Sequence, residues 1–353
     1  MYYGREDIRI DEVPEPTAPG SGDVLVEVSR ASICGTDVTE YLSGPVQIPL
    51  NRRHVASGHQ GPLVLGHEFA GRVVAVGSSV EEIRPGLRVG LGAGVWCGVC
   101  EWCRIGRTNL CASYYTLGLQ AHGGLAERVV APARMCRPVP DELSDDHACL
   151  SQPLAVALHA VRRAHGEPGR SAIVIGVGGI GSFILAAAHA AGLGPLLVVD
   201  VSKRRLETAT RIAPIQTINA SDQDAKSAVL DLTDGDGAWL VIEASGSSSG
   251  LTLATRVVRR GGRILIVGMQ ETPQPLDLRD LALREVDMVT TVAHVCDTDL
   301  SQSLTILARS ELGKLVVDRV IDLDDLVPLG IRPMVEKQTH GKVVVRTRQL
   351  EET

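Results

Sequence analysis

A strand-like apolar run that leads into three spaced glycines constrains this sequence more than any other feature. Residues 173–181 read IVIGVGGIG, and an Ala-rich run with helical character follows. In the spacing G-x-G-x-x-G the first glycine permits a tight turn, the second lets a pyrophosphate approach the backbone, and the third lets helix and strand pack closely. We assign these roles to Gly176, Gly178 and Gly181. The phosphates would lie at the positive helix N-terminus, beside Gly179 and Ile180.

A carboxylate stands where such a turn requires one for the ribose. A second apolar run ends at Asp200, which is 19 residues after Gly181. A carboxylate at this distance can accept hydrogen bonds from the ribose 2′-hydroxyl, and it repels a 2′-phosphate. The sequence therefore favours NAD over NADP. Lys203 is expected to reach the cofactor as well, and the basic run that it begins keeps NADP open as an alternative.

Strand-like and helix-like segments alternate around this turn, which predicts a parallel sheet covered by helices. The chain has 353 residues, a length that suggests two domains. We expect an NAD-binding Rossmann domain of the α/β class, a doubly wound parallel sheet, at residues 153–287. Residues 1–152 instead carry short β-like runs broken by Gly and Pro and are expected to form a β-rich domain. The expected strands of the parallel sheet are residues 172–175, 196–199, 239–243 and 263–267.

Charge and apolar patterning exclude several partners. The net charge of −7 argues against a general nucleic-acid-binding surface. Residues 173–199 contain no Asp, Glu, Lys or Arg and are long enough to span a bilayer, but their six glycines and two β-like runs favour a buried strand–helix–strand unit. The first residues lack the apolar core of a secretory signal, so we expect a cytoplasmic protein with reduced thiols and no membrane partner.

Four cysteines lie close together in the β-rich part, at Cys97, Cys100, Cys103 and Cys111. Four thiolates at such short spacing can surround one tetrahedral ion, which is typical of structural Zn²⁺ sites. The alternative is an iron–sulfur cluster, whose runs begin with the same spacing but continue C-x3-C-P. Here the last gap is seven residues and Ala112 follows, so zinc is favoured. Such a site has no open position and serves to hold a lobe together.

A second set of potential metal ligands precedes this lobe. Cys34 lies in the segment SICGTD, and His67 and Glu68 lie in LGHEFAG. One thiolate, one imidazole and one carboxylate would leave a fourth position open, as in catalytic zinc sites. The sequence does not by itself show that these residues meet in space, and a lone buried Cys or His is more often structural.

Taken together, these motifs resemble the zinc-dependent medium-chain alcohol and polyol dehydrogenases, and most of all the 2,3-butanediol dehydrogenases. The resemblance covers nearly the whole chain. It includes the GHE segment, the cysteine lobe, the glycine-rich turn and the motif PLAVALH at residues 153–159. Sorbitol and threonine dehydrogenases are the next most similar in appearance.

The resemblance implies a discontinuous, GroES-like catalytic domain formed by residues 1–152 and 288–353, with the site in a cleft between the domains, and a homodimer or homotetramer. It implies two Zn²⁺ ions per chain, of which Cys34, His67 and Glu68 would bind the catalytic one, together with NAD. Thr36 would contact the substrate hydroxyl, and Asp37 would orient His67. The implied reaction transfers hydride between NAD and a secondary alcohol, such as a vicinal diol, polyol or cyclitol, to give a ketone.

Two positions depart from the family pattern. Gln152 stands where the family usually has a Glu beside the zinc, and we include it among the candidate catalytic residues. Thr39 stands where the most similar relatives often carry a His that passes the alcohol proton toward solvent. Because of these departures, a redox-neutral epimerase or lyase that retains NAD remains an alternative. A non-enzymatic NAD-binding protein is a third hypothesis, although no expected metal ligand is missing.

Overall fold

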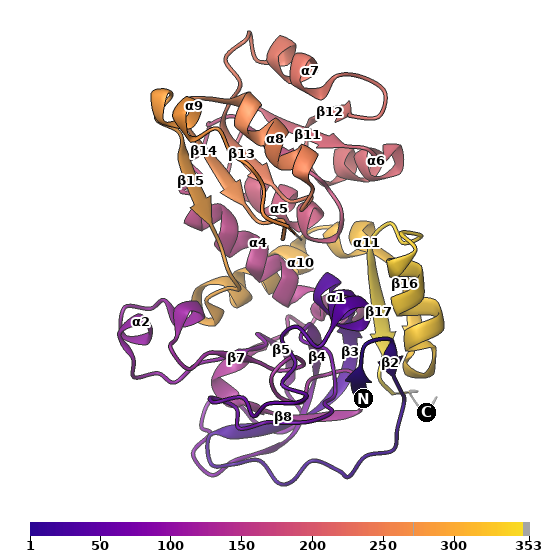
Figure 1. Cartoon of the computed structure of the whole chain (residues 1–353). Helices are drawn as coiled ribbons and strands as arrows, with labels where there is room; N and C mark the ends of the chain where they lie inside the picture. Colours follow the sequence, from indigo (N-terminus) through magenta and orange to yellow (C-terminus); the bar gives the residue numbers. More distant parts are fainter. Residues whose placement is uncertain (271, 349–353) are drawn as a thin grey trace. The chain divides into compact units, whose positions relative to one another are not determined.

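The computed structural model describes residues 1–270 and 272–348, and it divides into two compact units (Figure 1). The larger unit comprises Met1–Ala155 and His294–Thr353, and the smaller unit is Val156–Ala293. Helix α4 (Ser151–Arg163) contains the first boundary. The second boundary follows β15 (Asp287–Thr290), which is the last strand of the smaller unit's sheet.

The smaller unit is built on a six-stranded parallel sheet with the strand order β12-β11-β10-β13-β14-β15. The chain runs outward from β10 to β12 and then crosses back to β13 on the other side of β10. This reversal is the topological switch point of a doubly wound fold, and it confirms the expected fold class. The first five strands are β10 (Ala172–Ile175), β11 (Leu196–Asp200), β12 (Gln216–Asn219), β13 (Ala238–Glu243) and β14 (Val258–Ile266).

Helices connect these parallel strands. Helix α5 (Gly179–Ala190) contacts α6 (Lys203–Ile212), and helix α7 (Ala225–Leu232) contacts α8 (Ser248–Val257). Every residue of β10 and β11 is buried, as expected for central strands covered on both faces. The uncharged stretch of the sequence is β10, α5 and β11. Among the described residues, none of the helices has both the length and the apolar character needed to cross a membrane. A further helix of this unit is α9 (Leu278–Leu283).

The larger unit is β-rich, as expected, and its main sheet has the order β16-β17-β3-β4-β5-β9, with β8 also paired to β3. In β3 the valines at 24, 26 and 28 are buried and alternate with partly exposed residues, the pattern of an antiparallel strand with one face on the core. The strands are β3 (Asp23–Ser32), β4 (Phe69–Val76), β5 (Arg88–Leu91), β8 (Arg128–Pro132), β9 (Cys136–Pro138), β16 (Val317–Asp322) and β17 (Lys342–Arg346).

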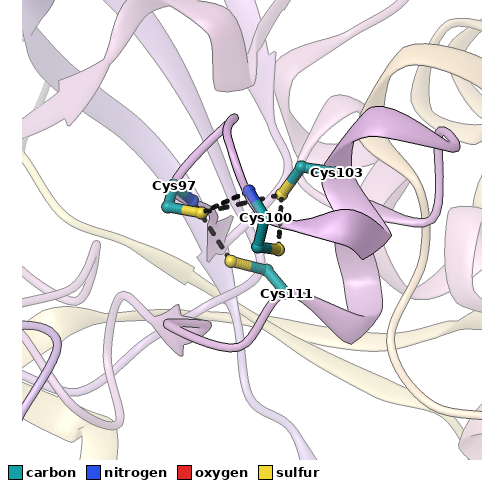
Figure 2. A group of neighbouring side chains, drawn as sticks. All are labelled: Cys97, Cys100, Cys103 and Cys111. Carbon is teal, nitrogen blue, oxygen red and sulfur yellow. Dashed lines mark hydrogen bonds between the residues drawn. The ribbon is translucent and has the colours of Figure 1, made fainter.

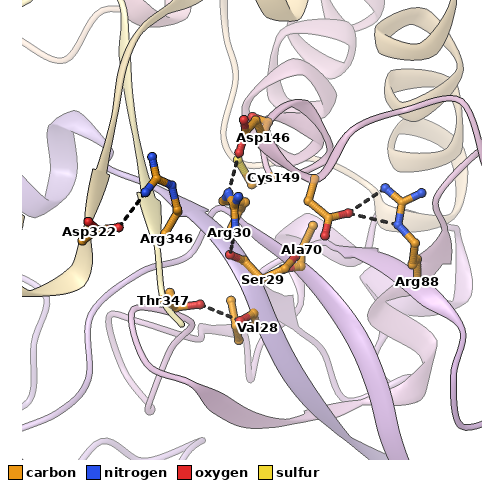
Figure 3. A network of polar contacts seen from close by, with 11 residues as sticks. Val28, Ser29, Arg30, Ala70, Arg88, Asp146, Cys149, Asp322, Arg346 and Thr347 are labelled. Carbon is orange, nitrogen blue, oxygen red and sulfur yellow. Dashed lines mark hydrogen bonds and ion pairs between the residues drawn. The ribbon is translucent and has the colours of Figure 1, made fainter. Parts of the chain in front are cut away.

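The C-terminal strand β17 lies next to the N-terminal strand β3 in this sheet, and the two pair antiparallel. Figure 3 shows polar contacts made by residues of these two segments. Arg346 pairs with Asp322 of β16 at 3.0 Å, and the Thr347 hydroxyl donates a hydrogen bond to the carbonyl of Val28. Arg30 of β3 pairs with Asp146 of the short helix α3 (Asp145–Ala148). The ladder pairs Val344 with Ser32 and Arg346 with Arg30, and this register places the first residue of β17, Lys342, beyond the end of β3.

Candidate active site and metal centres

The antiparallel pairing of β3 and β4 brings the two halves of the first ligand set together. Cys34 follows the end of β3 and is the N-cap of α1 (Gly35–Ser43). His67 and Glu68 directly precede β4, and the Ser32 amide donates a hydrogen bond to the Glu68 carbonyl at 2.7 Å. As a result, one ligand atom each of Cys34, His67 and Glu68 lie within 4.8 Å of one another. The three donor types and their spacing fit a zinc site with three protein ligands.

Negative charge surrounds His67 in this cluster. Burial alone would lower the pKa of the imidazole, but the charges of Cys34 and Asp37 raise the pKa of His67 to about 10. Asp37 is fully buried; its Oδ1 lies 3.7 Å from His67 Nδ1, and neither atom has a hydrogen-bond partner among the described residues. The other carboxylate oxygen of Asp37 accepts a hydrogen bond from the Cys34 amide at 2.9 Å. The electrostatics of this cluster therefore favour a bound cation.

Lys342 is a component of the cluster that the sequence interpretation missed. Its ammonium lies 2.5 Å from Glu68 Oε2 and donates a hydrogen bond to the carbonyl of Ile33 at 2.8 Å. The Ser32 hydroxyl donates to the same oxygen of Glu68. Burial would raise the pKa of Glu68, but Lys342 and His67 hold it below its usual value. One carboxylate oxygen of the expected ligand Glu68 is therefore already paired with a buried cation.

Three further residues were singled out from the sequence, two of them on the helix that begins at Cys34 and one on α4. Thr36 Oγ1 lies 3.6 Å from Cys34 Sγ. The exposed Thr39 donates its hydroxyl proton to the Gly35 carbonyl one helical turn earlier, so this side chain is tied to its own helix. Gln152 is buried in the first turn of α4, with 9% of its surface exposed. Its role toward the metal stays a prediction.

The four-cysteine lobe forms the second cluster, with all four sulfurs within 4.8 Å of one another (Figure 2). Tetrahedral zinc with Zn–S bonds of about 2.3 Å requires sulfurs about 3.8 Å apart. Two of the distances bracket this value: Cys100 Sγ to Cys103 Sγ is 3.5 Å, and Cys97 Sγ to Cys103 Sγ is 4.0 Å. The arrangement fits one closed tetrahedral site with Cys111 as its fourth ligand.

Backbone amides donate hydrogen bonds to the sulfurs of this lobe and so favour the thiolate form that binds a cation. N–H groups of Val99 and Cys100 donate to Cys97 Sγ and lower the pKa of Cys97. Backbone hydrogen bonds likewise lower the pKa of Cys100 to about 6. Cys103 differs, because burial raises its pKa to about 12, so an incoming metal ion must displace its proton. All four sulfurs accept backbone hydrogen bonds, since the Cys97 and Ser113 amides donate to Cys111 Sγ and the Gly98 amide donates to Cys103.

In the smaller unit, the glycine-rich turn connects β10 to α5. Gly176 has φ +85°, in the left-handed region, and a Cβ at Gly181 would lie 1.9 Å from the Gly176 carbonyl oxygen. Gly178 is the N-cap of α5, and a Cβ there would meet only the Arg205 guanidinium, at 3.8 Å. Gly179 and Ile180 form the first turn of α5. The helix N-terminus is therefore approachable by an anion such as a phosphate.

Asp200 lies at the carboxyl end of β11 and is 6% exposed. Its oxygens accept hydrogen bonds from the amides of Val177 and Ser202, each at 2.8 Å, so the carboxylate is held against the glycine-rich turn. Arg205 approaches Asp200 Oδ1 to 3.9 Å, whereas Lys203 is the first residue of α6. The carboxylate is thus held beside the glycine-rich turn with a basic residue next to it, and its role toward a ribose stays a prediction.

Comparisons with known proteins match both parts of the chain. Residues 20–141 match the alcohol dehydrogenase GroES-like domain, and residues 179–309 match the zinc-binding dehydrogenase family. The (R,R)-butanediol dehydrogenase of Neisseria gonorrhoeae is 30% identical over 349 residues, covering 98% of each chain. The sorbitol dehydrogenase of Bacillus subtilis is 33% identical over 290 residues, covering 82% of this chain and 80% of its own.

A crystal structure extends the similarity to the whole fold. The 2R,3R-butanediol dehydrogenase of Bacillus subtilis superposes with a TM-score of 0.90 at 29% identity, and the match covers 98% of each chain. The sequence similarity and the structural similarity thus extend over the same length of chain. The protein belongs to the family of zinc-dependent medium-chain alcohol and polyol dehydrogenases.

Proposed function

We propose that the chain oxidises a secondary alcohol, of the vicinal diol, polyol or cyclitol class, with NAD as the hydride acceptor. One observation carries the proposal: the chain combines the cluster of Cys34, His67 and Glu68 with a dinucleotide-binding turn whose ribose position holds Asp200. The reaction needs both a metal site for the alcohol oxygen and a binding site for the dinucleotide, and the two are independent observations. Relatives named for butanediol and sorbitol oxidation support the substrate class.

In this proposal Cys34, His67 and Glu68 hold the catalytic zinc, and the four-cysteine lobe holds a structural zinc. Bound zinc supplies a Lewis acid that polarises an alcohol or carbonyl oxygen. Asp37 faces His67 Nδ1, which would leave the other ring nitrogen free to bind the ion. Lys342 neutralises part of the charge of Glu68 and so would limit how strongly this carboxylate could bind the metal.

Thr36 is the proposed contact for the substrate hydroxyl. Its hydroxyl lies beside Cys34 Sγ at 3.6 Å, and a hydroxyl can both accept and donate a proton. It can therefore accept a hydrogen bond from the alcohol and pass the proton onward toward solvent. Thr39 has no titratable group, so the exit of this proton must use water or another residue rather than a His at this position.

The cofactor preference follows from Asp200. Its carboxylate is fixed by two backbone amides and still has acceptor capacity for ribose hydroxyls. A 2′-phosphate would bring a second negative charge against it, which favours NAD. NAD supplies the hydride chemistry, and the protein supplies binding and orientation.

Assembly and location are finer parts of the proposal. We propose a homodimer or homotetramer, as the family resemblance implies, which sedimentation or light scattering on the purified protein would establish. We also propose a cytoplasmic protein. The eight cysteines are all free thiols in the structure, and this arrangement suits a reducing compartment.

Two matched cysteine variants test the proposal. Cys34→Ala should remove one of two zinc ions per chain and abolish alcohol oxidation, because the site loses its thiolate ligand. Cys136→Ala, at a buried cysteine outside both clusters, should retain both ions and the activity. Zinc measured by elemental analysis, together with turnover, decides the matter. Full activity of Cys34→Ala, or a wild-type protein that contains iron and sulfide, would contradict the proposal.

A further inference from the structure

Glu243, the last residue of β13, is a fully buried carboxylate that the proposed function does not use. Its Oε1 accepts hydrogen bonds from the amides of Ser245 and Gly246, at 2.8 and 3.1 Å, and from the Ser245 hydroxyl. Its Oε2 accepts one from the side-chain amide of Gln270 at 3.3 Å. All of these donors are neutral, although burying a carboxylate is costly unless its lone pairs are satisfied.

These donors belong to two different turns. Ser245 and Gly246 follow β13, whereas Gln270 lies in the segment after β14. The main chain of Glu243 adds to the connection, because its carbonyl accepts hydrogen bonds from the amides of Val267 and Gly268, each at 2.9 Å. Glu243 therefore joins the turn after β13 to the turn after β14.

The two turns pack so closely that a side chain larger than glycine would clash at their contacts. A Cβ at Gly268 would lie 2.6 Å from Glu243 Oε2 and 2.2 Å from the Gly246 amide nitrogen. On the other side, a Cβ at Gly176 would lie 2.8 Å from the Cα of Ser245. The Ser245 backbone thus lies directly against the first glycine of the dinucleotide-binding turn. The turn after β13 therefore begins beside the proposed pyrophosphate position and continues away from it toward β14.

The strand order indicates which half of a dinucleotide these turns receive. In the proposed function the pyrophosphate would lie at the end of β10, and Asp200, the proposed ribose contact, lies at the end of the neighbouring strand β11. A dinucleotide lies across the carboxyl ends of the strands at the switch point. Its other half must therefore extend over the ends of β13 and β14, which Glu243 joins.

We propose that Glu243 is a positioning residue: it holds the two turns that form the binding site for the nicotinamide half of the cofactor, and it does not contribute to binding of the adenosine half. The inference rests on the proposed function, in that the ligand is a nicotinamide dinucleotide. The carboxylate is required because it presents only acceptors toward converging donors. The Gly246 amide also donates to Oε2 at 3.3 Å, so a glutamine would direct an NH₂ group at one of its backbone donors in either orientation and push the two turns apart.

The test compares binding of NADH and of AMP to the full-length, zinc-loaded protein by isothermal titration calorimetry. Glu243→Gln should weaken NADH binding by about tenfold and leave AMP binding within about twofold of the wild type. Glu207→Gln, at an exposed residue of α6, is the matched control and should change neither affinity. Ser245→Ala removes one donor to the carboxylate and should weaken NADH selectively by a smaller factor, so the test remains available if Glu243→Gln does not fold.

Equal weakening of NADH and AMP by Glu243→Gln would overturn the inference, because it would indicate general damage to the domain. NADH binding within about threefold of the wild type would overturn it as well. If the wild type bound neither NADH nor AMP, the proposed function itself would fail, and this outcome is distinct from a failure of Glu243 alone.

Discussion

Lys342→Met should change stability and zinc affinity in opposite directions. Lys342 and Glu68 form a buried pair at 2.5 Å, with side chains that are 8% and 2% exposed. Met matches the apolar stem of Lys in length but carries no charge, so the variant leaves the Glu68 carboxylate buried without its cation. The main effect should therefore be electrostatic rather than a loss of packing.

The burial of the pair and its short distance set the size of the expected changes in unfolding free energy and in zinc affinity. Removing one partner of a buried ion pair costs about 3–5 kcal/mol of unfolding free energy. For a unit of this size that corresponds to a fall of roughly 10 °C in the melting temperature of the metal-free protein. Glu68 then has no competing ammonium, and the site has lost one positive charge. At an effective dielectric constant near 20, a neighbouring charge is worth on the order of a few kcal/mol, so zinc should bind at least about tenfold more tightly.

The assay measures thermal unfolding of the zinc-free protein and zinc affinity by competition with a chelator. Lys314→Met is the control, since Lys314 forms an exposed pair with Glu311 that should contribute little. The double variant Lys342→Met/Glu68→Gln should recover most of the lost stability because neither charge remains. A variant that loses both stability and zinc affinity, or that changes neither, would refute the reasoning.

Three further variants test the other parts of the site. Cys100→Ser should remove the structural zinc and lower the melting temperature by several degrees, because structural zinc contributes directly to folding; an unchanged zinc content would contradict the closed tetrahedral site. Asp200→Gly should weaken NAD use and raise kcat/KM with NADP relative to NAD by about tenfold or more; a wild type that prefers NADP would show that Asp200 has been assigned the wrong role. Gln152→Glu should retain zinc better and move the rising limb of alcohol oxidation to higher pH, because an added negative charge disfavours loss of a proton nearby; identical pH profiles and zinc affinities would assign Gln152 a packing role only.

The features that the sequence predicted well are those whose chemistry is local. The glycines of the dinucleotide-binding turn lie between a strand and a helix; the predicted strand 172–175 coincides with β10, and the Ala-rich run predicted to be helical forms α5. The four cysteines lie within fifteen positions, so their spacing alone brings them near one another. Proximity along the chain was enough for both predictions.

Features that depend on tertiary contacts were harder to predict. Cys34 and His67 meet only because β3 pairs with β4. Lys342 was missed because it lies more than 270 positions after Glu68, and a lysine normally indicates an exposed surface. Glu243 gave no signal either, since a polar residue at the end of a strand is ordinary. Both side chains acquire their roles from burial, which depends on elements remote in the sequence.

The central claim is that this chain couples oxidation of a secondary alcohol to reduction of NAD. The most direct test incubates the zinc-loaded protein with NAD and each of a panel of vicinal diols, polyols, cyclitols and amino alcohols. NADH is followed by its absorbance, and the products are identified by mass spectrometry. The account predicts that at least one secondary alcohol yields one NADH for each ketone formed. Conversion of a substrate to an isomer or an elimination product without net NADH would contradict it and would favour an epimerase or lyase instead.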